Sequence, residues 1–144
     1  MSMPETYPMP LFVTLEVADM VASLSWYEAI GFTTVFAMPG PDRAPLFAHM
    51  RWIRYADVLL RQASASQGTK GLGIALNFMV EDDIDALAVR AKNVGAIFFN
   101  DIGDRPWNAR DFTLLDPDGF ALTFTFGPLK RREFDAVMRE TFQP

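Results

Sequence analysis

The stretch LFVTLEVADMVASLSWYEAIGF, residues 11–32, places an alternating segment directly before a helical one. Apolar and polar side chains alternate with period two over residues 11–17, which predicts a β-strand with one buried face. Asp19 has the position of a helix N-cap, and Gly31 has the position of the residue that ends the helix. The stretch therefore predicts a strand followed by a helix.

A second copy of this arrangement follows the small, polar and glycine-containing residues 63–72, which we interpret as a linker. Residues 74–80 alternate again, Asp82 is expected to cap a second helix, and Gly95 is expected to end it. Three pairs of matching positions are 63 residues apart, namely Val17 and Val80, Asp19 and Asp82, and Leu24 and Leu87. Two further pairs are 64 residues apart, namely Ile30 and Val94, and Gly31 and Gly95. This regularity indicates an internal duplication.

Each half continues as a set of short strands. The expected strands are residues 32–37, 46–52 and 57–62, then 96–99, 112–115 and 120–126, with a loop at 100–110 and a turn at 116–119. We therefore predict an α+β fold of two tandem βαβββ modules, in each of which the helix covers the apolar face of the sheet. We expect a single domain, 1–144, with module one at about 10–62, the linker at 63–72, module two at about 73–127 and a C-terminal helix at about 128–141.

Composition and charge narrow the classes of function. The 144 residues suffice for one domain with a core, and half of them are apolar. The absence of cysteine excludes disulfides, thiolate metal sites and a cysteine nucleophile. A formal charge of −5 argues against nucleic-acid binding, and no apolar stretch approaches the length of a membrane span. Residues 1–10 lack the pattern of a signal peptide, so we expect a cytoplasmic protein.

The run PWNARDF at residues 106–112 leads into DPDG at 116–119, while LEVAD at 15–19 and VEDDIDAL at 80–87 open the two expected helices. Together these segments resemble the glyoxalase, bleomycin-resistance and extradiol dioxygenase (vicinal oxygen chelate) superfamily. Members of its bleomycin-resistance-like branch usually have glycine where this chain has Asn108. The resemblance implies that the paired modules form a cup-shaped mixed sheet with the helices on the outside and hold a ligand in the cup. It also implies a homodimer, with modules paired within one chain or across two chains.

The resemblance also implies where a family metal site would lie. Enzymatic members hold a divalent metal ion through His, Glu or Gln on inward positions of the first and last strand of each module. These positions fall at Phe12, Leu59, Ala75 and Thr123, or at Leu60 in place of Leu59 if the register slips by one. None of these side chains is a ligand of that kind. The resemblance therefore implies a metal-free branch without a cofactor, and no catalytic residue is assigned.

Side chains on the inward faces are candidates for ligand binding. They are Phe12, Thr14, Glu16, His49, Arg51, Leu59, Arg61, Asn77, Trp107 and Thr123. His49, the single histidine, is a metal ligand, a ligand contact, or a packed or solvated strand residue. Glu16 either forms an ion pair with Arg51 or Arg61 or acts as an acid–base group. Trp107 either stacks on a flat ligand or packs as a hydrophobic lid.

Three functions remain open at this point. The first is a metal-independent small-molecule-binding protein that sequesters an antibiotic or an aromatic metabolite, which would give antibiotic resistance. The missing metal ligands and the PWNARDF run favour this function. The second is an enzyme, similar to a lyase or dioxygenase, with a non-family active site that uses Glu16 or His49. The third is an interaction or regulatory domain whose cup is largely filled.

Overall fold

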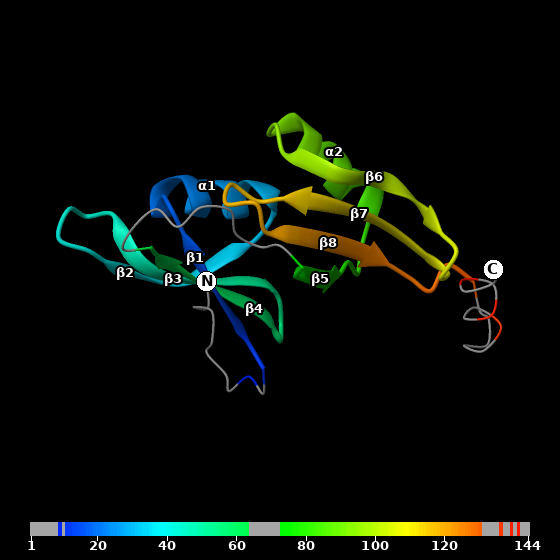
Figure 1. The fold of residues 1–144 in the computed structure, drawn as a ribbon, viewed down its shortest axis with the longest axis horizontal. Coiled ribbons are helices and arrows are strands. Elements are labelled where there is room, and N and C mark those ends of the chain that lie inside the picture. Colours follow the sequence, from blue (N-terminus) through cyan, green and yellow to red (C-terminus); the bar gives the residue numbers. More distant parts are fainter. Residues whose placement is uncertain are drawn as a thin grey trace. The chain divides into compact units, whose positions relative to one another are not determined.

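The computed structural model describes residue 9, residues 11–63 and 73–130, and residues 136, 139 and 141. Its elements are β1 (Val13–Val17), α1 (Met20–Ile30), β2 (Thr33–Pro39), β3 (Pro45–Ile53), β4 (Ala56–Gln62), β5 (Ala75–Met79), α2 (Ile84–Asn93), β6 (Ile97–Arg105), β7 (Ala109–Leu115) and β8 (Ala121–Phe126) (Figure 1). The chain divides into two compact units, Met1–Leu72 with Asp116–Gly119, and Gly73–Leu115 with Phe120–Pro144. The order of elements confirms the α+β fold of two βαβββ modules.

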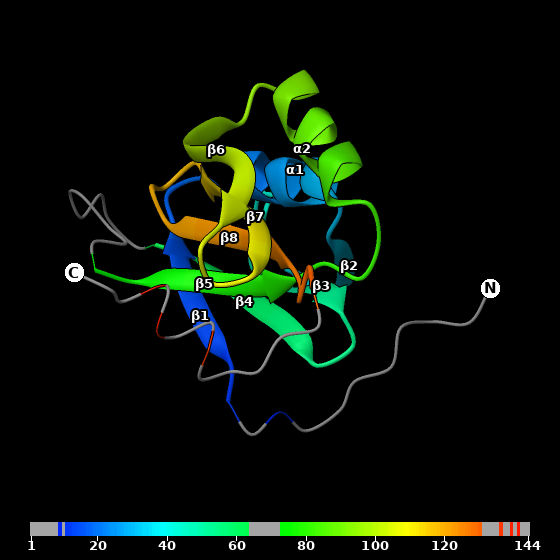
Figure 2. The ribbon, with the colours of Figure 1, turned by 90° about the vertical axis from the view of Figure 1, so that its right-hand side faces the viewer.

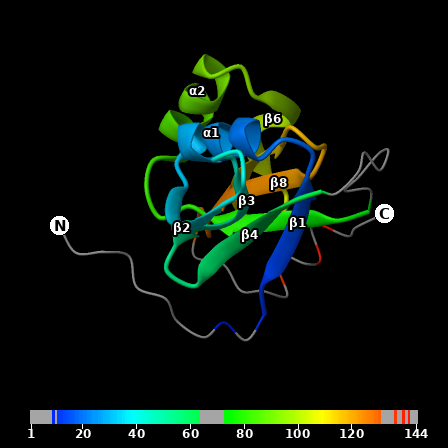
Figure 3. The ribbon, with the colours of Figure 1, turned by 90° about the vertical axis from the view of Figure 1, so that its left-hand side faces the viewer.

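In the first unit, a four-stranded sheet has the order β1-β4-β3-β2, and α1 lies over one of its faces (Figure 3). β1 and β4 are parallel, whereas the other neighbouring strands are antiparallel. The buried core contains Leu15, Val17, Met20, Tyr27, Ile30, Ala48, Met50, Val58 and Leu60. The predicted alternation of the first strand is confirmed, because Leu15 and Val17 are buried, whereas Thr14 on the other face is exposed and Glu16 is half-buried. Burial of this apolar face is the main favourable term that holds α1 on the sheet.

The second unit repeats the scheme with the strand order β5-β8-β7-β6 and α2 over one face (Figure 2). Phe78 of β5, Phe112 of β7 and Phe124 of β8 are buried in its core, and Phe98 of β6 is half-buried beside them. Phe78, Phe124 and Phe112 are stacked with ring centroids 5.4 Å apart, and Phe98 lies 5.5 Å from Phe112. Offset aromatic pairs at these distances contribute beyond their buried area. This row of four rings therefore forms a rigid support behind the opposite face of the sheet.

The start of α2 corrects one prediction. The N-cap is Asp83, not Asp82, because the Asp83 side chain accepts a hydrogen bond from the backbone N–H of Ala86 at 3.1 Å. Capping at this position puts Ile84 at the first helical position, where it is buried as Met20 is in α1. The extra residue of the second repeat therefore lies between β5 and α2, and burial of the first apolar residue decides which aspartate is the cap.

The predicted loop at residues 100–110 is also wrong. β6 continues through Arg105, residues 106–108 form a turn, and β7 begins at Ala109. The register of the β6–β7 pair shifts between Phe98 and Asn100 and again between Asn100 and Gly103. Such bulges break the two-residue period, so the strand has no regular alternation in the sequence. The backbone ladder nevertheless persists on both sides of them.

Two of the predicted segments fall mainly outside the described residues. The linker, 63–72, is described only at Ala63. Of the predicted C-terminal helix, 128–141, residues 128–130 lie outside any helix, residues 136, 139 and 141 are helical, and the others are not described. Within the described residues, no helix is both long enough and apolar enough to cross a membrane.

The DPDG turn, Asp116–Gly119, belongs to the first unit. The hydroxyl group of Tyr27, in α1, donates a hydrogen bond to Oδ2 of Asp116 at 2.8 Å, and both residues are buried. The backbone N–H of Ala18 donates to Oδ1 of Asp118 at 2.9 Å. Burial and the neighbouring Asp116 raise the pKa of Tyr27 well above its ordinary value. The predicted turn is confirmed, with Gly119 at a φ of 90°.

Replacement of Tyr27 by phenylalanine should lower the free energy of unfolding by about 1.5–3 kcal/mol, because a buried carboxylate then loses a hydrogen bond. The unfolded chain releases the tyrosine proton near pH 10, before the folded chain does, so wild-type stability should fall as the pH rises above about 10. Urea unfolding at pH 8 and at pH 11 measures both effects. If Tyr27→Phe lost as much unfolding free energy between pH 8 and pH 11 as the wild type does, Tyr27 would not be the group responsible for the alkaline loss of stability.

Candidate functional site

The face of the second sheet opposite α2, here called the inner face, forms an open cavity of about 530 Å³. Hydroxyl, amide and charged side chains line it, together with one aromatic ring. The lining residues are Asn77, Asn100, Arg105, Trp107, Asp111, Thr113, Thr123 and Thr125. A concave surface with a few converging polar groups is typical of a small-molecule site.

Alternation along the strands explains why polar groups gather on this face. Phe112 and Leu114 of β7 point into the core, so Asp111 and Thr113 point to the inner face. The ladder sets Thr113 beside Thr123 of β8, and their hydroxyl oxygens form a hydrogen bond of 2.7 Å. Thr123 in turn pairs with Asn77 of β5, and Thr113 with Asn100 of β6. One cross-strand row therefore presents two amides and two hydroxyls to the cavity.

The cavity also contains one pair of oppositely charged side chains, Arg105 of β6 and Asp111 of β7. Arg105 Nε donates to Asp111 Oδ1 at 2.7 Å, and the Asp111 side chain is 9% exposed. Arg105 Nη2 also donates to the backbone oxygens of Asp101 at 2.6 Å and Asp111 at 3.2 Å. These bonds tie the end of β6 to β7 directly below the turn that carries Trp107.

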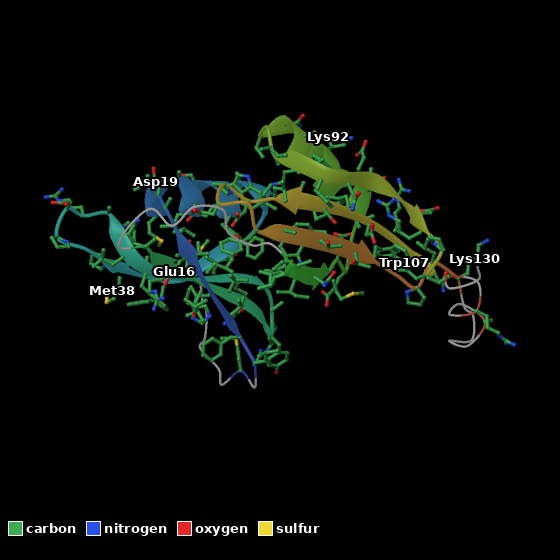
Figure 4. All side chains as sticks on the ribbon, in the orientation of Figure 1. Glu16, Asp19, Met38, Lys92, Trp107 and Lys130 are labelled. Atoms are coloured by element: carbon green, nitrogen blue, oxygen red, sulfur yellow. The ribbon has the colours of Figure 1, made fainter. Side chains whose placement is uncertain are left out.

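The turn that carries Trp107 is built around Asn108. Asn108 has a φ of 65°, a left-handed conformation that asparagine and glycine tolerate, which explains why asparagine can stand at a position where glycine is usual. Its side chain donates to the backbone oxygen of Lys130 at 2.6 Å and accepts from the Lys130 N–H at 3.0 Å. Figure 4 shows Trp107 and Lys130 at the same end of this sheet. Trp107 remains 47% exposed, so its ring is accessible from the cavity that it lines.

The corresponding face of the first sheet carries a buried acidic group. The carboxylate of Asp57, with a side chain that is 0% exposed, accepts from His49 Nε2 at 2.7 Å. It also accepts from Arg51 Nε at 2.9 Å and Arg51 Nη2 at 2.9 Å. The sequence suggested His49 as a candidate but not this partner, because Asp57 and His49 meet only through the β3–β4 register. His49 is thus a hydrogen-bonded residue of β3, and its contact with a ligand stays a prediction.

Glu16 lies on the same face and forms an ion pair with Arg61. Both side chains are partly exposed. The register places Thr14 beside Leu59, and Leu59 beside His49. Large exposed apolar side chains complete this face, namely Phe12, Phe36 and Met38. The face is therefore polar at its centre and apolar around it.

The two faces divide the predicted site residues between them. Asn77, Trp107 and Thr123 line the cavity of the second unit. The other seven lie in the first unit, and they are Phe12, Thr14, Glu16, His49, Arg51, Leu59 and Arg61. The list of candidates lacked five lining residues, Asn100, Arg105, Asp111, Thr113 and Thr125. Alternation along β7 and β8 could have revealed Asp111, Thr113 and Thr125, whereas Asn100 and Arg105 lie in the segment that had been predicted as a loop.

The positions of the family metal site do not fit a divalent metal ion. Phe12 and Ala75 are exposed, and Leu59 and Thr123 are half-buried. Phenyl, methyl and isobutyl groups offer no donor atom, and a neutral threonine hydroxyl is a poor ligand. Across the described parts of the chain, no group of three or more His, Cys, Asp or Glu side chains is placed to hold a metal ion.

Ion pairs outside the cavity shift the pKa values of exposed carboxyl groups. A hydrogen bond from Arg110 lowers the pKa of Asp85, which lies on α2. Arg110 also pairs with Asp104 at 2.9 Å. The backbone N–H of Ile102, and then Lys92, lower the pKa of Asp101. These pairs fasten α2 and β6 to β7 from outside the cavity.

Comparison with known proteins agrees with this architecture. The profile of the Glyoxalase/Bleomycin resistance protein/Dioxygenase superfamily matches residues 11–124. No curated protein matches the sequence.

Solved structures share the fold. TioX from Micromonospora sp. ML1 is 20% identical, with a TM-score of 0.66, over 85% of this chain and 98% of its own. A glyoxalase/bleomycin resistance protein from Catenulispora acidiphila DSM 44928 is 22% identical, with a TM-score of 0.62, over 84% of this chain and 100% of its own. A glyoxalase/bleomycin resistance protein/dioxygenase from Alicyclobacillus acidocaldarius is 16% identical, with a TM-score of 0.59, over 81% and 89%. The similarity to these solved structures concerns the fold alone. Because the family profile matches most of the sequence, the chain belongs to the glyoxalase/bleomycin resistance protein/dioxygenase superfamily.

Proposed function

We propose that this protein binds a small molecule of the antibiotic or aromatic-metabolite type without a metal ion and acts by sequestering it. The observation that carries the proposal is the cavity of about 530 Å³ in the second unit, where polar groups converge beside an accessible tryptophan ring. A cavity of this size suits a drug-sized ligand.

The chemistry of the lining supports binding. Hydroxyl and amide side chains orient a ligand through hydrogen bonds but do not activate water or stabilise a strong nucleophile. The positions that would supply metal ligands hold apolar side chains and one threonine. Binding therefore accounts for the groups that are present, whereas metal-assisted chemistry lacks its donor atoms.

A thermal-shift screen tests the function directly. The purified protein, treated with a chelator, is screened against glycopeptide antibiotics and flat aromatic metabolites. We expect at least one compound to stabilise the chelated protein in proportion to its concentration, because a ligand that binds only the folded state raises its stability. Product analysis of the same mixtures should recover the ligand unchanged. Stabilisation that requires an added divalent metal ion would contradict the proposal, as would a panel without any ligand.

Replacement of Trp107 by alanine should weaken binding of the ligand found in this screen by about tenfold, because the stacking surface is lost. Binding should also quench the tryptophan fluorescence of the wild type more than that of the Trp107→Phe variant. Calorimetric titration gives the affinity. Val89→Ala, a change at an exposed residue of α2, is the control and should bind as the wild type does. Equal affinities of wild type and Trp107→Ala would show that the ring only covers the turn.

The resemblance to the family also leads us to propose a homodimer. The exposed Phe12, Phe36 and Met38 of the first unit form the kind of apolar surface that contacts a partner. Light scattering after size-exclusion chromatography should give twice the mass of the chain. A monomer at micromolar concentration would contradict this part of the proposal.

A further inference from the structure

The ion pair in the cavity leaves one carboxylate oxygen available to a ligand. Asp111 Oδ1 accepts from Arg105 Nε, whereas Oδ2 accepts no hydrogen bond from the described residues. Within that part of the chain, Ser23 Oγ is the one side-chain polar atom that is fully buried without a partner. Oδ2 of Asp111 is therefore accessible, and Asp111 lines the cavity.

The same pair leaves one guanidinium nitrogen available. Nε and Nη2 of Arg105 make the hydrogen bonds to Asp111 and Asp101, and Nη1 makes none to the described residues. A Cβ atom built at Gly103 would lie 3.5 Å from Nη1 of Arg105 and 3.8 Å from its Cζ. Gly103 is directly opposite Asp111 in the antiparallel ladder, and opposite residues project from the same face. The guanidinium group therefore lies over Gly103 on the inner face, beside the open carboxylate.

The charges of the cavity cancel. Asp111 and Arg105 are its two charged lining residues, and the other six carry neutral side chains. An anionic ligand group that approaches Arg105 also approaches Asp111, and a cationic group that approaches Asp111 also approaches Arg105. A group of either charge thus loses hydration without a net electrostatic gain. A neutral group with one donor and one acceptor can satisfy both open atoms.

We propose that this cavity selects an uncharged planar ligand with an amide-type edge, that is, an adjacent N–H and C=O as in a carboxamide or lactam. The N–H donates to Asp111 Oδ2, the C=O accepts from Arg105 Nη1, and the flat part of the ligand contacts Trp107. The inference rests on the proposed binding function and names the ligand class of the same site. Specificity arises because a ligand of either charge leaves one member of the pair poorly matched.

Three probes with the same ring test this selection, namely 2-naphthamide, 2-naphthoate and 2-naphthamidine. They differ only in the group that would meet the pair, which is neutral, anionic or cationic at pH 7. Binding is followed by NMR on isotope-labelled protein, through the indole N–H of Trp107 identified by its loss in Trp107→Phe. We expect the amide to bind the wild type at least about tenfold more tightly than either charged probe.

Two variants should invert the order of affinities. Asp111→Asn leaves a net positive cavity, so the naphthoate should become the tightest of the three probes. Arg105→Gln leaves a net negative cavity, so the naphthamidine should become the tightest. A purely structural role of the pair would weaken all three probes equally and would not reverse their order.

The ion pair of Arg110 with Asp104, which lies outside the cavity, supplies matched controls. Arg110→Gln and Asp104→Asn remove the same charges from the same two strands, but neither residue lines the cavity. Both controls should keep the preference for the amide. If Asp111→Asn fails to fold, the proposed selectivity is still tested by the order of the three affinities in the wild type and by its inversion in Arg105→Gln.

The outcomes separate the two proposals. Preference of the wild type for the acid or the amidine, or the absence of inversion in a folded variant, overturns the selectivity while the binding function stands. If none of the probes binds and the ligand screen is also empty, both proposals fail. If the screen finds a ligand without an amide-type edge that binds in this cavity, only the selectivity fails.

Discussion

Replacement of Phe112 by alanine should lower the free energy of unfolding by about 3–5 kcal/mol, one of the two largest effects that we expect from a single change in this chain. Phe112 is 0% exposed and is the middle ring of the row formed with Phe124 and Phe98. Its removal takes away the buried surface, both ring contacts and the support behind Asp111 and Thr113. Urea unfolding followed by circular dichroism measures the loss.

Phe99 offers the matched control, since it lies on β6 next to Phe98 in sequence but is 66% exposed. Phe99→Ala should change the stability by no more than about 0.5 kcal/mol. Phe112→Leu keeps most of the volume and should cost less than the alanine change, so it allows ligand binding to be measured in a folded protein. A cost below about 1 kcal/mol for Phe112→Ala would mean that the ring row does not hold the second sheet together.

Replacement of Asp57 by alanine should lower the free energy of unfolding by about 3–5 kcal/mol, because it removes the buried carboxylate that accepts from both His49 and Arg51. The Asp57 side chain is fully buried, and those of His49 and Arg51 are only 13% exposed. Little water can therefore reach the site to replace the lost hydrogen bonds. Chemical unfolding at pH 7 and at two salt concentrations should show a large loss that depends little on salt.

Arg61→Ala on the same face is the control for this prediction. It removes the ion pair of Arg61 with Glu16, whose side chains are 58% and 33% exposed. Because exposed pairs are screened and mobile, its cost should be about 0–1 kcal/mol and should fall further at high salt. Similar costs for Asp57→Ala and Arg61→Ala would contradict the assignment of Asp57 as the group that holds the centre of this face.

Prediction from the sequence succeeded where local signals were strong. Asp19 accepts the hydrogen bond of an N-cap, and Gly31 has a φ of 134° at the end of α1. The alternation of residues 11–17 and 74–80 placed the correct side chains on each face. These features depend on neighbours within four residues, so the sequence contains the whole signal.

Prediction failed where pairing between strands decides the structure. β6 is interrupted by register shifts, and its polar residues do not alternate, so its second half was predicted as a loop. Asn100 and Arg105 were therefore not recognised as lining residues. The pairing of Arg51 with Asp57 likewise follows from strand register and was not predicted, whereas the ion pair of Glu16 with Arg61 was one of the predicted alternatives.

The sequence by itself determined the two βαβββ modules, the caps of α1 and the DPDG turn, because each of these depends on residue type and short-range spacing. Only the tertiary structure decided that Arg105 neutralises Asp111 inside a polar cavity, that Asp57 is buried under His49 and Arg51, and that Tyr27 holds Asp116. These contacts join residues whose proximity depends on the ladder register and on burial, and neither can be read from one strand alone.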